Sequence, residues 1–306
     1  MKHKHVVSIL CLGAAMLLSA CVQNKSSSSS TTENTESASQ SASETNTSVS
    51  TSASTSSNSS ASSTSSTSLS PDIVAKYPYI EKNTTDTIDA HGADSTMIKA
   101  LDAQMDADAR DATQSFTYRG MFSVWAFTDA DKSISGNLRS FYSGKSTSPS
   151  ACNREHVWPN SRKGEVTEDD PHVLRPTLNS ENSDRGNSFY GETTGWDPAT
   201  FKNPKYRGIA ARIIFYSAVR YQDSGLWLED ANNPTSTNSN QRPTMGKLSL
   251  LLKWNLQYPV DETETQRNDV LYTKYKFCRN VFIDHPEYAT KIWGNVNSAC
   301  KAACGL

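Results

Sequence analysis

A long serine and threonine tract divides the chain into two parts of different composition. Residues 26–70 contain 32 Ser or Thr residues among 45 positions and no aromatic residue. A segment with so little apolar surface cannot offset the entropy lost on ordering, so we expect it to stay disordered and to act as a tether. The hydrophobic core must therefore form within residues 71–306, and no second change of composition interrupts them. A single domain is predicted there.

The N-terminus has the pattern of an export signal. Two lysines precede an apolar run at residues 6–20, which ends in Leu-Ser-Ala before Cys21. A membrane-spanning helix needs about 20 residues, so this shorter run favours a signal peptide over a permanent anchor. The Leu-Ser-Ala-Cys sequence at the end of this run resembles a bacterial lipoprotein box, and a plain secretory signal peptide is the alternative. We expect a signal peptide at residues 1–20, lipidation of Cys21, a linker at residues 21–70, and anchoring to the outer side of the cell membrane.

Four cysteines remain in the predicted domain, namely Cys152, Cys278, Cys300 and Cys304. Exported proteins fold in an oxidising compartment, so one or two disulfides are expected. Four cysteines permit three pairings, and the sequence does not choose among them. A four-cysteine zinc site normally shows close pairs of ligands. Only Cys300 and Cys304 are near neighbours, which is evidence against zinc.

The charge of the chain is close to balanced, with 30 Lys or Arg, 32 Asp or Glu and a formal net charge of −2. This excludes a strongly basic coat as the means of binding nucleic acid. A polyanionic partner must instead meet a local basic cluster or a metal ion. Five basic residues within 32 positions are candidates for holding phosphates, with ordinary ion pairing as the alternative. They are Arg154, Arg162, Lys163, Arg175 and Arg185.

Hydrophobic periodicity indicates a helix-rich α+β domain. A β-favouring segment at residues 138–142 ends in a Ser-Gly turn. Asp284 and Glu287 fit a helix start, so His285 between them is interpreted as structural. Residues 151–192 are polar with little periodicity, and functional sites often lie on such segments. The predicted helices are residues 72–82, 95–109, 209–221, 248–258 and 264–279.

Several motifs in this order carry a resemblance. Residues 154–159 read Arg-Glu-His-Val-Trp-Pro, residues 170–176 read Asp-Pro-His-Val-Leu-Arg-Pro, and residues 182–187 read Asn-Ser-Asp-Arg-Gly-Asn. Arg-Asn-Asp-Val-Leu-Tyr and Phe-Ile-Asp-His-Pro-Glu-Tyr follow at residues 267–272 and 282–288. The combination resembles the bacterial endonuclease I family, secreted and periplasmic nucleases of the ββα-metal class. The resemblance covers most of residues 110–295.

The resemblance implies that a β-hairpin and the following helix clamp one divalent cation. It puts Glu155 and His156 on the first strand, residues 172–174 on the second and Asn182 on the helix. Glu155 and Asn182 would then bind the metal, and His156 would activate water. Adjacent side chains leave an extended strand on opposite faces, which suits two separate roles. Oxygen ligands with open positions suit Mg²⁺, with Mn²⁺ or Ca²⁺ as other occupants.

Some positions depart from the family pattern or keep two interpretations. Pro171 replaces the usual Leu beside His172, so the second strand is expected to be short or at an edge. Glu181 stands where a small apolar residue is common, which leaves Asn179 as an alternative ligand to Asn182. His172 is interpreted as bracing the hairpin rather than as a ligand. For three aromatic residues, packing in the core is preferred over stacking on nucleic-acid bases as the interpretation. They are Trp158, Tyr190 and Trp196.

The expected reaction is hydrolysis of a phosphodiester. Negative charge gathers on the phosphate as water attacks in line with the leaving 3′-oxygen, and a cation neutralises it. A histidine with a pKa of ~6.5 is mostly neutral outside the cell and can accept the proton of that water. Arg185 is our candidate for contacting the transition state, since the family's functional arginine does not map onto a fixed position here.

The sequence thus predicts a monomeric endonuclease with little sequence preference, acting on DNA, RNA or both and leaving 5′-phosphates. A surface adhesin or binding module that kept the fold without activity is the alternative from a different class. The joint presence of Glu155, His156 and Asn182 is evidence against it, because a binding module has no need of that trio.

Overall fold

The structure is a computed structural model that describes residues 94–109, 112, 114–234 and 244–306. The predicted signal peptide, Cys21, the tether and the predicted helix at residues 72–82 lie outside these residues, so they stay predictions. In the part of the chain that is described, no helix is long and apolar enough to cross a membrane.

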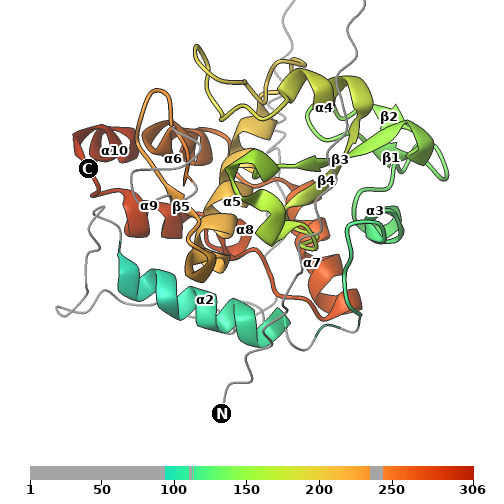
Figure 1. Ribbon diagram of the computed structural model, residues 1–306, viewed down its shortest axis with the longest axis horizontal. Helices are drawn as coiled ribbons and strands as arrows, with labels where there is room; N and C mark the ends of the chain where they lie inside the picture. The colour runs from blue at the N-terminus through green and yellow to red at the C-terminus, as the bar shows by residue number, and fades with distance from the viewer. Residues whose placement is uncertain (1–93, 110–111, 113, 235–243) are drawn as a thin grey trace, which may run out of the picture. The chain divides into compact units, whose positions relative to one another are not determined.

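The described chain is rich in helices and its strands form small two-stranded sheets, so the helix-rich α+β prediction is confirmed (Figure 1). The β1–β2 and β3–β4 pairs are antiparallel, and β5–β6 is parallel. The strands are β1 (Leu138–Arg139), β2 (Ser146–Thr147), β3 (Cys152–His156), β4 (Leu174–Leu178), β5 (Trp227–Leu228) and β6 (Thr244–Met245). The helices are α2 (Ser95–Ala109), α3 (Met121–Thr128), α4 (Asn179–Arg185), α5 (Lys205–Arg220), α6 (Leu248–Gln257), α7 (Glu262–Tyr275), α8 (Val281–Asp284), α9 (Glu287–Trp293) and α10 (Ser298–Cys304).

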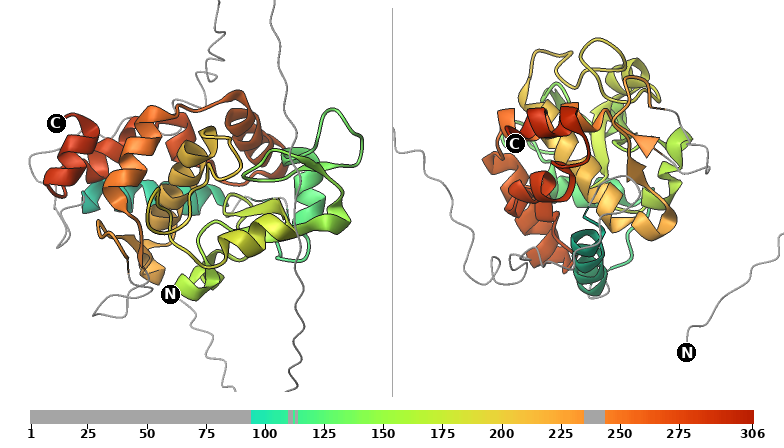
Figure 2. Two further views of the ribbon diagram at one scale, coloured as in Figure 1. Left: turned by 90° about the horizontal axis from the view of Figure 1, so that it is seen from above. Right: turned by 90° about the vertical axis from the view of Figure 1, so that its left-hand side faces the viewer.

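Helix α5 is the central element, packed against α2, α6 and α8 (Figures 1 and 2). All of its residues from 208 to 219 are buried, as expected of a helix that is largely apolar on every side. A Cβ atom at Gly208 would lie 2.4 Å from the carbonyl oxygen of Tyr258, so glycine is needed where α5 meets the end of α6. Buried Arg212 pairs with Glu264 of α7, with Nη2–Oε2 and Nε–Oε1 distances of 2.5 and 2.8 Å.

The ends of some elements differ from the prediction. The strand expected at residues 138–142 is limited to β1, because Tyr142 turns the chain with a φ of +71°. The predicted cap at Asp284 is wrong. This carboxylate accepts hydrogen bonds from Arg279 Nε and Nη2 at 2.6 and 2.7 Å, and Pro286 occupies the N-cap position of α9. His285 stacks on Tyr288 with ring centroids 4.6 Å apart, in keeping with a structural role.

The β3–β4 hairpin and α4 follow one another and pack together (Figure 1). Glu155 pairs with Arg175, and His156 pairs with Leu174. The expectation that Pro171 and His172 belong to the second strand is wrong, because β4 begins at Leu174. Asp170 forms a turn before it: its carbonyl accepts from the Leu174 amide at 3.0 Å and its Oδ1 from the His172 amide at 2.7 Å.

The predicted disulfides are also corrected, since the structure has all four cysteines of the predicted domain as free thiols. Cys152 lies on β3, Cys278 follows α7, and Cys300 and Cys304 lie one turn apart on α10. Cys278 Sγ is 3.3 Å from the hydroxyl of Tyr216. Burial raises the pKa of Cys278 to about 12. Cys152, Cys278 and Cys300 are buried, whereas Cys304 is partly exposed.

Candidate active site

Glu155 lies inside the hairpin, with only 1% of the residue exposed. Its Oε1 accepts a hydrogen bond from the Tyr142 hydroxyl at 2.7 Å and lies 3.2 Å from Arg185 Nε. Both contacts use Oε1, so Oε2 takes part in neither. Burial raises the pKa of Glu155, while the Arg185 cation and the Tyr142 hydrogen bond act in the opposite direction. The structure thus holds this carboxylate in one orientation.

Tyr142 is a member of the site that the sequence did not suggest. It is fully buried, and its hydroxyl is 2.8 Å from that of Tyr190 as well as bonded to Glu155. Its φ of +71° is unfavourable for a residue with a Cβ atom, and such conformations persist where the surroundings require them. The only sequence signal nearby was the Ser-Gly turn that follows Tyr142.

His156 points to the other side of β3 from Glu155 and is half-buried, as the alternation of a strand requires. Its Nε2 is buried and has no hydrogen-bond partner in the described part of the chain. The imidazole bonds to the backbone of Arg154, which places the lone pair on the unpartnered nitrogen. Burial, and then the Arg185 cation, lower the pKa of His156 to about 4. This histidine is therefore neutral, and its Nε2 is an acceptor without a partner among the described residues.

Asn182 lies half-buried on α4, which packs against β3. Asn179, the alternative ligand, is exposed at the first position of the same helix. Glu181 points inward instead: the residue is 2% exposed, and its Oε2 accepts a hydrogen bond from Ser140 Oγ at 2.7 Å. The structure thus places Glu155, His156 and Asn182 on two packed elements.

The arginines of the predicted basic cluster are mostly engaged within the protein. Arg185 is 1% exposed and donates to the carbonyl oxygens of Val157 and Gly186 at 2.9 and 3.0 Å, in addition to its ion pair with Glu155. Arg175 pairs with Asp129 at 3.0 Å. Arg162 donates to two backbone carbonyls, and Arg154 donates to the Tyr118 carbonyl at 2.7 Å. Lys163 is exposed.

The oxygen donors of Glu155 and Asn182 fit a hard divalent cation. No group of three or more His, Cys, Asp or Glu side chains in the described ranges is arranged to hold a metal ion. Mg²⁺ commonly uses one or two protein carboxylates and keeps several waters. A site with one carboxylate and one amide oxygen therefore suits Mg²⁺ better than a metal that demands a complete set of protein ligands.

The remaining candidates lie in the core. Trp158, Tyr190 and Trp196 are 0%, 0% and 8% exposed, which confirms core packing. His172 is 2% exposed, and its Nε2 is 2.8 Å from the carbonyl oxygen of Cys278. This contact joins the hairpin to the segment after α7, in keeping with a bracing role for His172.

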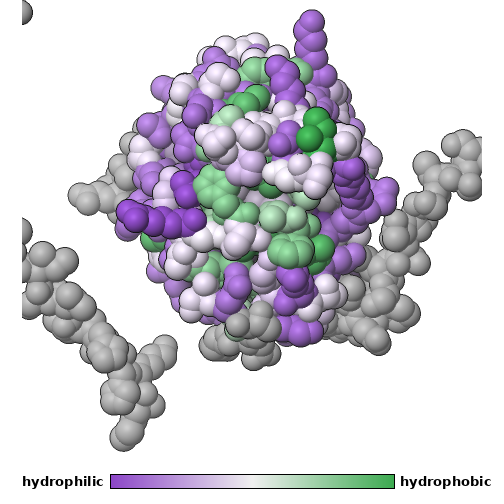
Figure 3. Space-filling model, turned by 90° about the vertical axis from the view of Figure 1, so that its right-hand side faces the viewer, coloured by the Kyte–Doolittle hydropathy of each residue, from purple (hydrophilic) through white to green (hydrophobic). Residues whose placement is uncertain are grey.

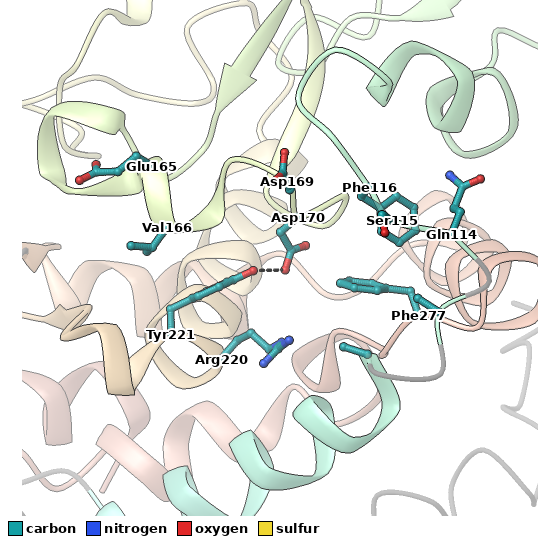
Figure 4. Close-up of a pocket in the computed structure, with 12 residues that line it drawn as sticks. Gln114, Ser115, Phe116, Glu165, Val166, Asp169, Asp170, Arg220, Tyr221 and Phe277 are labelled. Carbon is teal, nitrogen blue, oxygen red and sulfur yellow. Dashed lines mark hydrogen bonds between the residues drawn. The ribbon is translucent and has the colours of Figure 1, made fainter. Parts of the chain in front are cut away.

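A cavity of about 630 Å³ lies beside the turn that precedes β4 (Figure 4). Phe116, Glu165, Asp169, Arg220 and Phe277 contribute to its wall, and Figure 4 shows the Tyr221 hydroxyl bonded to the Asp170 carboxylate. None of the predicted metal ligands or His156 lines it. The cavity and the predicted chemistry are thus separate features of the molecule.

The face that carries α3 has a mixed surface, with apolar residues interspersed among hydrophilic ones (Figure 3). Phe127 of α3 is 57% exposed, and the Lys274 ammonium lies 3.9 Å from the centre of its ring. Such cation–π contacts partly cover exposed aromatic rings.

Comparison with known proteins identifies the family. The Endonuclease I family model matches residues 96–287, which include β3, β4 and α4. An extracellular ribonuclease of Bacillus amyloliquefaciens is 37% identical over 202 residues, covering 58% of this chain and 68% of the relative. An extracellular ribonuclease of Bacillus subtilis (strain 168) is 37% identical over 205 residues, with the same shares covered. The chain therefore belongs to the Endonuclease I family and is a nuclease.

Proposed function

We propose that this nuclease hydrolyses the phosphodiester bonds of extracellular RNA and DNA with the help of one divalent cation and leaves 5′-phosphates. The observation that carries the proposal is the unpartnered Nε2 of His156. His156 follows the buried Glu155 on β3, and the two side chains leave the strand on opposite faces. The names of the two Bacillus relatives support RNA as a substrate. DNA is included because an attack by water makes no use of a 2′-hydroxyl.

Glu155 and Asn182 would hold the cation, which is Mg²⁺ in this proposal, with Mn²⁺ or Ca²⁺ as substitutes. When bound, the cation would neutralise charge on the phosphate undergoing cleavage. Oε2 of Glu155 is the oxygen offered to it, because Tyr142 and Arg185 both contact Oε1. Arg185 then acts as the fixed partner of Glu155. Its contact with the transition state stays a prediction.

His156 would accept the proton of the attacking water at Nε2. The bond between the water oxygen and phosphorus forms as the bond from phosphorus to the 3′-oxygen breaks. The phosphate therefore stays on the 5′-oxygen of the downstream product. The departing 3′-oxygen takes a proton from solvent water, which leaves a 3′-hydroxyl on the upstream product. The backbone hydrogen bond of Arg154 keeps the imidazole in the tautomer that can take this proton.

The product ends test this reaction. Short RNA and DNA strands are incubated with the full chain in Mg²⁺ and, separately, in EDTA, and the ends are identified by mass spectrometry. We expect 5′-phosphate and 3′-hydroxyl ends from both substrates and no cleavage in EDTA. Cyclic 2′,3′-phosphates, or full activity in EDTA, would contradict the proposal.

We also propose that the protein works outside the cytoplasm, held to the membrane by a lipid on Cys21. The extracellular relatives support the location, and the Leu-Ser-Ala-Cys exit supports the anchor. Cells grown with a labelled fatty acid should label the wild-type protein but not Cys21→Ser. Absence of label on the wild type would rule out the anchor and leave the secreted nuclease intact as a proposal.

A further inference from the structure

The segment between α2 and α3 places an aromatic ring against His156. Tyr118 stacks on the imidazole with ring centroids 5.4 Å apart and an interplanar angle of 19°. Tyr118 is half-buried and belongs to neither a helix nor a sheet. It lies 38 positions before His156 in the sequence and outside the motifs that carry the family resemblance. The contact is therefore a product of the fold.

Arg154 joins the same assembly from the strand. Arg154 and His156 are two positions apart on β3, so their side chains leave the strand on the same face. The Arg154 guanidinium carbon lies 4.7 Å from the centre of the Tyr118 ring and 4.5 Å from that of Phe122. We call these four side chains, Phe122, Arg154, Tyr118 and His156, the Tyr118 stack.

Three hydrogen bonds fix the backbone around Tyr118. Arg154 Nε donates to the Tyr118 carbonyl at 2.7 Å, and Arg154 Nη2 donates to the Arg119 carbonyl at 3.4 Å. The Tyr118 amide donates to Asp169 Oδ1 at 2.7 Å. Asp169 lies in the connection between β3 and β4, so Tyr118 is tied to the strand and to the far part of the hairpin. An irregular segment thus presents its ring at a defined place.

The stacking of Tyr118 is a contact that can orient the His156 ring. A histidine that acts as a general base is commonly oriented by a third group that bonds to its other nitrogen. Here that bond goes to the Arg154 backbone, and Nε2 has no partner among the described residues. The torsion that turns an imidazole about its Cβ–Cγ bond has broad minima. A ring stacked on the imidazole restricts this rotation.

We propose that Tyr118 is a positioning residue for His156, holding the imidazole by stacking so that Nε2 faces the attacking water. The inference rests on the proposed role of His156 as the general base. Tyr118 acts through the ring and not through its hydroxyl. The free energy of an aromatic contact of this kind corresponds to a factor of about 3 to 10 in a rate constant. We therefore expect kcat to fall by about 3- to 10-fold when the ring is removed.

Three substitutions separate the effect of the Tyr118 ring from that of its hydroxyl and of its bulk. Tyr118→Ala should lower kcat on a nucleic-acid strand by about 3- to 10-fold with little change in KM, because the ring does not bind the strand. Tyr118→Phe should keep the wild-type kcat. Tyr118→Leu keeps apolar bulk without a flat ring, and it should behave like Tyr118→Ala while protecting the fold. Thermal unfolding of each variant confirms that a folded protein is being assayed.

A double-mutant cycle then asks whether Tyr118 acts through His156. In a His156→Ala background, Tyr118→Ala should cause no further loss of rate. The NMR signals of the His156 ring, identified by their absence from His156→Ala, provide a readout without metal or substrate. Tyr118→Ala should remove the ring-current shift of these signals, and Tyr118→Phe should keep it.

Two results would overturn the inference while the proposed function stands. One is a wild-type kcat for both Tyr118→Ala and Tyr118→Leu. The other is an equal loss in the wild-type and His156→Ala backgrounds, which would mark Tyr118 as merely structural. If His156→Ala itself cleaves at the wild-type rate, the proposed function fails and the positioning role fails with it.

Discussion

Two carboxylate–histidine pairs of the hairpin have similar chemistry and different surroundings. On β3, Glu155 is buried and His156 is half-buried with an unpartnered Nε2. In the turn before β4, Asp170 and His172 are both 2% exposed. Their polar atoms meet protein partners: His172 Nε2 lies 2.8 Å from the Cys278 carbonyl oxygen.

The turn is stabilised further by hydroxyl groups. Asp170 Oδ2 accepts hydrogen bonds from Tyr216 and Tyr221, each at 2.8 Å. Burial lowers the pKa of His172 to about 3, with a further contribution from Arg267. A histidine with a fixed partner on Nε2 joins two parts of the fold, whereas one with an open Nε2 can exchange a proton. The comparison therefore predicts that the turn before β4 contributes to stability and that β3 contributes to the chemistry.

The largest expected effect is a loss of cleavage rate when His156 is replaced. His156→Ala should lower the cleavage rate by about 10²- to 10⁴-fold, the usual contribution of a general base, and should leave the protein folded. Initial rates and a thermal melt of the purified variant measure the two properties. A variant that cuts at the wild-type rate would remove His156 from the mechanism.

His172→Ala should show the opposite pattern. Loss of the buried ring leaves a cavity and an unsatisfied Cys278 carbonyl, so the free energy of unfolding should fall by about 2–4 kcal/mol. The rate per folded molecule should stay near wild type. Urea unfolding followed by assays below the transition tests this. A fully stable variant with a large loss of rate would show that His172 has a chemical role.

The next effect separates the metal ligands from the base. Glu155→Ala and Asn182→Ala should raise the Mg²⁺ concentration needed for half-maximal rate by about 10- to 100-fold, because each removes an oxygen ligand. His156→Ala should leave that concentration nearly unchanged. Asn179→Ala is the matched control on the same helix. A shift in the Asn179 variant alone would show that the ligand lies three residues earlier than proposed.

The smallest effect is the pH dependence of stability. The pKa of His172 is about 3 in the folded protein and ~6.5 in the unfolded protein, so the unfolded state binds more protons as the pH falls. The stabilisation is present above pH ~6.5 and is lost below it by about 1.4 kcal/mol per pH unit. His172→Gln, which cannot titrate, should have a flatter profile between pH 6.5 and 5. Parallel profiles would contradict this assignment.

Local patterns predicted the main helices because their signals lie within each segment. Residues 95–109 form α2 as expected, and the apolar run at residues 209–221 lies within or next to α5. The start of α7 is set by Asp261, whose Oδ1 accepts from the amides of Thr263 and Glu264. The cap expected at Asp284 is wrong because both oxygens of that carboxylate accept hydrogen bonds from Arg279.

The sequence alone determined the family, the helix-rich α+β class and the separation of Glu155 from His156 on opposite faces of a strand. These properties depend on residue identity and on the period of two along a strand. They need no knowledge of distant contacts, so they could be obtained from the chain as it is printed.

Only the tertiary structure decided what surrounds those side chains. The contact of Tyr118 with His156, the hydroxyl of Tyr142 on Glu155 and the engagement of Arg185 all come from segments brought together by packing. The bond between His172 and Cys278 spans 106 positions. Neither propensity nor spacing encodes such pairs, because they depend on how α5 and the hairpin fill the shared core. The same structure has Cys152, Cys278, Cys300 and Cys304 as free thiols, a pairing state that the sequence left open.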